Sequence, residues 1–209
     1  MSSLSSPSSP PSLPTVDDIR ALHLKYAPTP EAFELVHTHC RVVAELAERM
    51  RAEAAPEADA EWVRAGALLH DIGVYELFDA DGRFRMGEYV RHGVIGHEIL
   101  RREGFPERLC RFCSCHTGVG ITRDDIRRQG LPLPEADYVA TTTEEQLVMY
   151  ADKFHTKSDP PAFLTAETYA AGLARMFGPE KTAGFEALRD RFGEPDVAGC
   201  AARYGHVLR

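Results

Sequence analysis

Apolar side chains in this chain recur at steps of three and four residues between turn-forming residues such as Pro and Gly. The stretch that follows Thr29-Pro30 places Val36, Val43 and Leu46 on one such line. Thr before a helix and Pro at its first position are typical start signals, and the spacing matches the 3.6-residue turn of an α-helix. Sustained two-residue alternation, which would indicate strands, is hard to find. The pattern therefore predicts an all-α fold, a compact multi-helix bundle.

The same periodicity predicts one helical domain over residues 16–209, in which residues 163–209 supply C-terminal packing helices. Further helices are expected at roughly 17–26, 59–72, 88–104, 106–116, 123–129, 143–157, 166–177 and 179–192. Asp81-Gly82, between Phe78 and Phe84, predicts a hairpin or a tight loop. Residues 1–15 are interpreted as a disordered tail, because the first 14 residues hold seven Ser and four Pro and bury little apolar surface.

Composition limits the possible partners. The chain has 24 Lys and Arg against 32 Asp and Glu, a net charge of −8. An acidic surface argues against a nucleic acid polymer, whose phosphates need a basic face. A small phosphorylated substrate remains compatible, because the charge of a bound metal can dominate its site.

No apolar run is long enough to span a membrane, and the N-terminus lacks the features of a signal peptide. Together with an odd number of Cys, five, these features predict a cytoplasmic protein, and a homodimer is compatible with them.

Several expected helices carry an ionisable residue where the apolar stripe should continue. His39 falls between Val36 and Val43, and Asp152 follows Val148 by four. Taken singly, such a residue is more often a hydrogen-bonded core histidine, a helix cap or an ion-pair partner. If five separate segments each place an ionisable residue in one core, every unpaired charge costs several kcal/mol of folding free energy. A bound metal would offset this cost. The residues concerned are His39, His70, Asp71, His92, His116 and Asp152.

These six residues suit a pair of metals. Nitrogen and oxygen donors without thiolate favour Fe or Mn, and also fit Zn, Co or Ni. Six ligands are too many for one catalytic ion and sufficient for two. Asp71 is expected to bridge the ions, since adjacent helical residues point about 100° apart. His39, His70 and Asp152 would then bind one ion, and His92 and His116 the other.

The order of these residues resembles the HD superfamily of metal-dependent phosphohydrolases. The matching segments cover most of residues 30–157, at His39–Ala47, Leu68–Gly73, Arg91–Gly96, Cys115–Gly118 and Tyr150–Lys153. The resemblance implies a helical fold around two divalent transition metal ions bound by the six residues. It also implies hydrolysis of a phosphate ester or anhydride in a small molecule, with a nucleotide as the favoured substrate.

The expected mechanism is attack on phosphorus by a hydroxide shared between the two ions. Asp71 would bridge the ions, and Asp152 would bind one of them and orient the hydroxide. Many relatives carry Lys directly after the His-Asp-Ile-Gly tetrad, where this chain has Val74, which argues against cyclic-dinucleotide cleavage and leaves the general acid unassigned. Lys153 is the candidate substitute, as a proton donor or a phosphate contact, although it could equally be a solvated lysine. Arg91 is the second candidate phosphate contact.

Two other functions stay open. Some HD relatives hold a mixed-valent di-iron centre on the same kind of ligand set and act as oxygenases on small oxygenated or phosphonate substrates. A nucleotide sensor with a decayed metal site is less compatible, because loss of catalysis removes the need for costly buried ligands.

Overall fold

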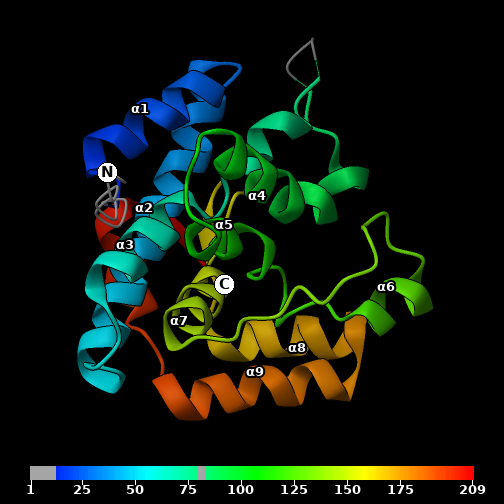
Figure 1. Cartoon of the computed structure of the whole chain (residues 1–209). Coiled ribbons are helices and arrows are strands. Elements are labelled where there is room, and N and C mark those ends of the chain that lie inside the picture. The colour runs from blue at the N-terminus through cyan, green and yellow to red at the C-terminus, as the bar shows by residue number, and fades with distance from the viewer. Residues whose placement is uncertain (1–12, 80–82) are drawn as a thin grey trace, which may run out of the picture.

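The computed structural model describes residues 13–79 and 83–209 and is built almost wholly of helices (Figure 1). The α-helices are α1 (Val16–Tyr26), α2 (Pro30–Ala54), α3 (Ala60–Leu69), α4 (His92–Arg102), α5 (Glu107–Ser114), α6 (Arg123–Gln129), α7 (Thr143–Ala151), α8 (Ala166–Phe177), α9 (Pro179–Phe192) and α10 (Val197–Tyr204). Three short 3₁₀ helices join them, namely η1 (Ile72–Leu77), η2 (Met86–Arg91) and η3 (Asp152–Phe154). The all-α prediction is confirmed. No helix in the described ranges is both long and apolar enough to cross a membrane.

Threonine and aspartate side chains begin several of these helices. Thr29 Oγ1 accepts a hydrogen bond from Ala32 N at the start of α2, directly before Pro30. Thr142 and Glu145 form a reciprocal capping box at the start of α7. Such caps satisfy amide groups that have no partner within the helix, and each typically contributes about 1 kcal/mol. The positions of the helix starts thus follow from local sequence.

The long helix α2 runs through the core. Its buried face includes Val36, Cys40, Val43 and Ala47, and it packs against α3 and α7. In Figure 1 the helices α8 and α9 lie side by side along one edge of the molecule. The donor residues described below lie on α2 and where four other helices, α3, α4, α5 and α7, begin or end.

Three expected helices are shorter than predicted. The helix predicted over 59–72 ends at Leu69, and the one over 143–157 ends at Ala151. The stretch predicted as 88–104 divides into η2 and α4 at His92. Each change of path falls beside a predicted ligand, because the chain must leave the helical path to turn these side chains to one centre. Asp71, for example, has φ −107° and ψ 12°, outside the α-helix.

A small sheet was not expected from the sequence. Its strands are β1 (His155–Thr156), β2 (Ala162–Phe163) and β3 (Val207–Leu208), with β1 antiparallel and β3 parallel to β2. Strands of two residues are too short to show alternation. The predicted turn at 81–82 lies outside the described residues, but its flanks Phe78 and Phe84 form an antiparallel bridge.

Most of the tail predicted over residues 1–15 also lies outside the described residues. In the part that the structure describes, Leu13 packs against the core and Thr15 caps α1. Leu13 and Thr15 therefore contact the helical domain, although the sequence analysis placed the start of the domain at residue 16.

Gly73 controls the distance between η1 and α4. A Cβ atom on this residue would lie 2.1 Å from His92 O and 2.3 Å from Gly96 N. No side chain fits such a gap, so a glycine is required for the two segments to touch. This contact places Asp71 beside His92.

Candidate metal centre

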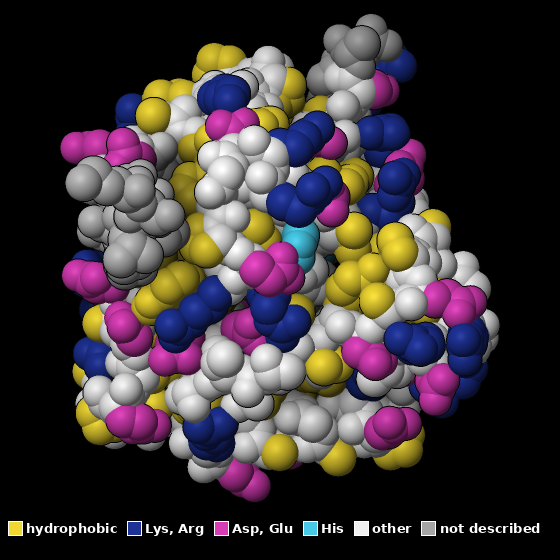
Figure 2. All heavy atoms as spheres, in the orientation of Figure 1, with side chains coloured by type: hydrophobic (Ala, Val, Ile, Leu, Met, Phe, Trp, Pro, Cys, Tyr) yellow, Lys and Arg dark blue, Asp and Glu magenta, His cyan; other side chains and the backbone are white. Residues whose placement is uncertain are grey.

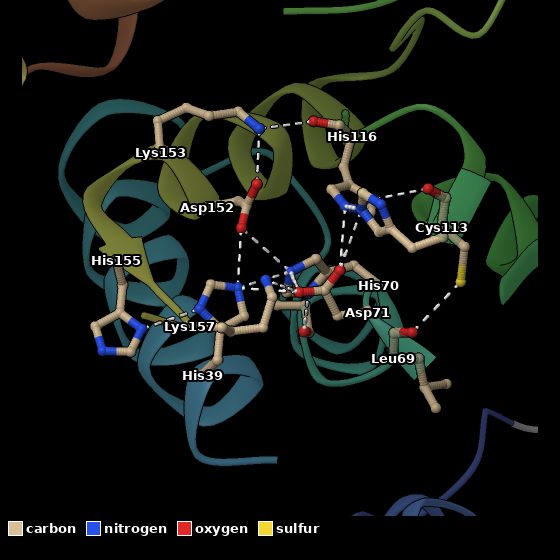
Figure 3. Close-up of polar contacts among 12 residues, drawn as sticks. His39, Leu69, His70, Asp71, Cys113, His116, Asp152, Lys153, His155 and Lys157 are labelled. Atoms are coloured by element: carbon tan, nitrogen blue, oxygen red, sulfur yellow. Dashed lines mark hydrogen bonds and ion pairs between the residues drawn. The ribbon is translucent and has the colours of Figure 1, made fainter. Parts of the chain in front are cut away.

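The six predicted ligands come together in the interior as two donor groups (Figure 3). The first group, here called group one, comprises His39, His70, Asp71 and Asp152, and the second, group two, comprises Asp71, His92 and His116. Within each group the candidate donor atoms all lie within 4.8 Å of one another. Five of the residues are buried, and Asp152 keeps 14% of its side chain exposed.

Group one lies between α2, the end of α3 and the end of α7. His39 Nε2 lies 2.9 Å from Asp152 Oδ1 and 3.2 Å from Asp71 Oδ2. His70 Nε2 is 3.4 Å from each of the same two oxygens. The two imidazoles and two carboxylates therefore face a common point.

Group two uses the other oxygen of Asp71. Asp71 Oδ1 lies 3.3 Å from His92 Nε2 and 3.4 Å from His116 Nε2. The two Nε2 atoms are themselves 2.9 Å apart. Asp71 is thus the residue shared by both groups, and its role as a bridge between two ions stays a prediction.

Hydrogen bonds on the far side of three rings determine which nitrogen faces the centre. The Nδ1 atoms of His70, His92 and His116 lie 2.6, 2.5 and 2.7 Å from the carbonyl oxygens of Ala67, Tyr89 and Cys113. A carbonyl only accepts, so each Nδ1 carries the proton, and in the neutral form of each ring the lone pair of Nε2 points inward.

This arrangement needs a cation. The lone pairs of His92 Nε2 and His116 Nε2 face each other at 2.9 Å, where neither can donate. Asp71 Oδ1, which lies between them, is buried and has no hydrogen-bond donor. A buried acceptor without a donor is costly, and a divalent metal ion would satisfy all three atoms. Group two therefore fits one divalent ion, and the four residues of group one, which face a common point, fit a second.

The protonation states agree with this interpretation. Burial lowers the pKa of His92 to about 3 and also lowers the pKa of His116. Burial by itself would raise the pKa of Asp71, but the Lys157 ammonium holds that pKa well below its usual range. At neutral pH these residues are thus neutral imidazoles and an ionised carboxylate, the forms that bind metals.

Two lysines lie beside the carboxylates. Lys153 Nζ donates to Asp152 Oδ2 at 2.7 Å and to the carbonyl of His116 at 2.8 Å. Lys157 Nζ donates to Asp71 Oδ2. A cavity of about 220 Å³ next to the donor groups is lined by both lysines and by Tyr89, Tyr169 and Thr117, among others. The centre thus faces a cavity for a small molecule on the side that carries the two lysines.

The structure does not bring Arg91 to this cavity. Arg91 pairs with Glu88 at 2.5 Å on its own short helix η2. It lines a separate surface hollow together with Glu76 and Arg102. Because η2 ends at Arg91 and α4 begins at His92, these adjacent side chains point in different directions. Arg91 lies at the surface hollow, and His92 lies in group two.

Lys157 and His155 were missed by the sequence analysis. His155 Nδ1 lies 2.9 Å from His39 Nδ1, and its Nε2 lies 2.9 Å from His206 Nδ1, so the ring of His39 is held from behind. A helix continuing to residue 157 would turn Lys157 about 140° away from Asp152. Only the change to η3 and β1 brings it to Asp71, and no local pattern signals that change.

Comparison with known proteins identifies the class to which this centre belongs. A family model described as the HD domain matches residues 36–157, more than half of the 209-residue chain. The chain belongs to the HD-domain family.

Among its relatives is an uncharacterized protein of Methanocaldococcus jannaschii, 40% identical over 129 residues, which cover 59% of this chain and 69% of that protein. A tRNA (cytidine(56)-2'-O)-methyltransferase of Picrophilus torridus is 38% identical over 58% of this chain, and its Thermoplasma volcanium counterpart is 36% identical over the same share. The matched segment spans only about a third of each methyltransferase, 31% and 32%. The methyltransferase name therefore describes those longer proteins.

The fold is also that of a solved HD domain. The HD domain of the phosphodiesterase PgpH from L. monocytogenes superposes with a TM-score of 0.53 at 18% identity, covering 89% of this chain and 98% of that one. The same domain in complex with cyclic-di-AMP gives a TM-score of 0.51 at 16% identity, over 89% and 97% of the two chains. At such identity the likeness is one of fold.

Proposed function

We propose that this chain is a metal-dependent hydrolase that cleaves a phosphate ester or anhydride bond of a small molecule. The observation that carries the proposal is the shared carboxylate of Asp71, with one oxygen in each donor group. Two groups of nitrogen and oxygen donors joined by a carboxylate are suited to a pair of divalent ions, with Fe or Mn favoured and Zn, Co or Ni compatible. When bound, such ions acidify water and neutralise phosphate charge.

The protein side chains would hold and orient the reactants. Asp71 joins the two donor groups, and Asp152 completes group one while its second oxygen is held by Lys153. Lys153 therefore orients Asp152 and adds positive charge to the cavity wall. Lys157 takes the phosphate-contact role that the sequence analysis assigned to Arg91, because its ammonium lies in the cavity beside Asp71.

A nucleotide is the substrate favoured by the family resemblance. The complex of the PgpH domain with cyclic-di-AMP supports a small phosphorylated nucleotide. Val74, the residue after the His-Asp-Ile-Gly tetrad, is 1% exposed within the core and offers no polar group to a substrate. This continues to argue against a cyclic dinucleotide.

Metal-dependent phosphate release tests the proposal. The protein is loaded with Mn(II), Fe(II) or Zn(II) without oxygen and assayed with simple phosphate monoesters, phosphodiesters and nucleoside mono- and polyphosphates. We expect release that requires metal and is lost in Asp71→Asn. The matched control is Asp190→Asn, which changes an exposed carboxylate on α9 and should keep full activity.

The oxygenase alternative predicts the opposite result in the same experiment. Substrate-dependent uptake of O₂ by the Fe(II)-loaded protein, without metal-dependent release of phosphate from any ester, would contradict the hydrolase proposal.

A further inference from the structure

A second and larger cavity adjoins the one beside the donor groups. It has a volume of about 420 Å³, within the range of roughly 300–1,000 Å³ that is typical of ligand pockets. Tyr89, Thr117 and Gly118 line both cavities. The two cavities are therefore neighbours at these three residues.

The larger cavity is lined mainly by apolar side chains. They come from η2, the loop before α6, the end of α6 and α8, and are Val90, Val119, Ile121, Leu131, Leu173, Met176 and Phe177. Met176 and Phe177, at the end of α8, are 66% and 50% exposed, which is unusual for such large apolar residues in the described part of the chain. On the face shown in Figure 2, hydrophobic side chains gather between the positions of α4 and α6. Exposed apolar surface of this kind often marks a binding site.

The charged residues of the larger cavity already have partners. Lys181 Nζ donates to Asp125 Oδ2 at 2.6 Å and to the carbonyl of Gly120 at 2.8 Å. Asp125 also accepts from Thr122 N at 2.9 Å, from Thr122 Oγ1 at 2.8 Å and from Arg128 at 2.6 Å. No charge is left over to bind a second phosphate group. The cavity beside the donor groups, by contrast, adjoins the residues that fit two divalent ions, and Lys153 and Lys157 lie on its wall as partners of Asp152 and Asp71.

From this separation of charged and apolar surface we infer that the substrate is a phosphate monoester of a hydrophobic alcohol, alkyl or aryl. The inference rests on the proposed hydrolase function. The phosphate group binds beside the lysines, and the hydrocarbon group lies in the larger cavity. In the reaction the phosphorus–oxygen bond to the alcohol breaks, and water supplies a hydroxyl group to phosphorus and a proton to the leaving alcohol.

A nucleoside fits this cavity less well than a hydrocarbon. Gln129 offers the only side-chain amide among its lining residues. A nucleobase has several donors and acceptors on its edge, and each one buried without a partner would weaken binding. The hydrocarbon group has no such groups to satisfy.

A series of straight-chain alkyl phosphates, from methyl to octyl, tests the inference with the metal-loaded chain of 209 residues. We expect kcat/KM to rise about three- to fourfold per added methylene until the cavity is filled, as expected for a CH₂ group that leaves water. Met176→Glu places a charge at the rim of the cavity and should remove most of this dependence. Leu24→Glu, on an exposed face of α1, is the matched control and should keep it.

Binding of non-hydrolysable alkyl phosphonates to the same chain, metal-free and metal-loaded, provides a measurement that does not require turnover. Affinity that increases with chain length, and does so less in Met176→Glu, supports the inference. Equal affinity for methyl and octyl phosphonate, or a dependence retained in Met176→Glu, would overturn it. If no ester releases phosphate, the hydrolase proposal fails, and the phosphonate series still decides whether the cavity binds hydrocarbon.

Discussion

At the scale of single residues, Asp71 holds the two donor groups together. Its Oδ2 faces His39 and its Oδ1 faces His92, at 3.2 and 3.3 Å. The Nδ1 atoms of the two histidines have different partners. That of His92 contacts a backbone carbonyl, and that of His39 contacts the ring of His155. Each metal position can therefore be altered separately by substitution.

Replacing His92 should remove one of two bound ions. In His92→Ala, group two keeps only Asp71 and His116, whereas group one is intact, so we expect the bound metal to fall from two ions to one per chain. Elemental analysis after dialysis against a limiting metal buffer measures the ratio. The matched control is His37→Ala, because the ring of His37 stacks on Phe33 and belongs to neither donor group. A ratio of two in His92→Ala would contradict the assignment of group two.

His23 illustrates a buried histidine with a structural role. Its Nε2 lies 2.8 Å from the carbonyl of Leu68 and therefore donates, and its Nδ1, 2.8 Å from the hydroxyl of Tyr75, accepts. With both nitrogens used, the ring is neutral, and burial lowers the pKa of His23 to about 4. The sequence analysis did not single out this residue, because a histidine whose nitrogens are both satisfied by the fold has no local signature.

The pKa of His23 predicts a dependence of stability on pH. The unfolded chain binds a proton near pH 6.5 and the folded chain only near pH 4, so His23 contributes stability above pH 6.5 that is lost as the pH falls to about 4. The contribution is about 3 kcal/mol at most, from a shift of this size. Urea unfolding of the wild type and of His23→Gln at pH 7 and pH 4 measures this contribution. Between pH 7 and pH 4 the wild type should lose more unfolding free energy than His23→Gln. A difference that is independent of pH would show that His23 does not titrate in this way.

At the scale of secondary-structure elements, the donor residues lie mainly where helices begin or end. His70 follows α3, His92 begins α4, and Asp152 follows α7. The helix starts are predictable from capping residues such as Thr142, because those signals are local. The helix ends at Leu69 and Ala151 were not predicted, because apolar periodicity continues past both points. There tertiary contacts, such as that between η1 and α4, determine the path of the chain.

The contact between η1 and α4 predicts a large effect for a single methyl group. In Gly73→Ala the new Cβ would overlap His92 O and Gly96 N, so η1 and α4 must separate. We expect a loss of about 1–3 kcal/mol in unfolding free energy, as for overpacked cores, together with weaker binding of the ion held by His92. Thermal unfolding and metal titration measure the two effects.

The matched control is Gly87→Ala in the neighbouring 3₁₀ helix η2. A Cβ on Gly87 would meet no atom within 4 Å, so this substitution should leave both quantities nearly unchanged. Equal effects of the two substitutions would contradict the role assigned to the contact at Gly73.

At the scale of the whole molecule, the centre joins segments that are far apart in the chain. Group one alone connects α2, α3 and α7, and His39 contacts His155 across 116 positions of sequence. Ions bound between these segments cross-link the folded state, and the unfolded chain has no such preformed site. Metal binding should therefore be coupled to global stability.

Removing metal should lower the melting temperature. With free metal at about 100 times its dissociation constant, binding adds roughly 2.7 kcal/mol, which for a chain of this length raises the melting temperature by about 5–10 °C. Calorimetry of the protein with Mn(II) and with a chelator in excess measures the difference. In Asp71→Asn the shift should be largely lost, and an undiminished shift in that variant would place the metal elsewhere.

The sequence by itself determined the helical class of the fold and the identity of the six residues that form the two donor groups. Both follow from periodicity within single helices, where residues three or four apart share a face. The tertiary structure decided that Arg91 lies away from the centre, that Lys157 reaches Asp71, and that an apolar cavity shares Tyr89 with the cavity beside the donor groups. These features depend on where helices end and how distant segments pack, and neither is encoded in the spacing of neighbouring residues.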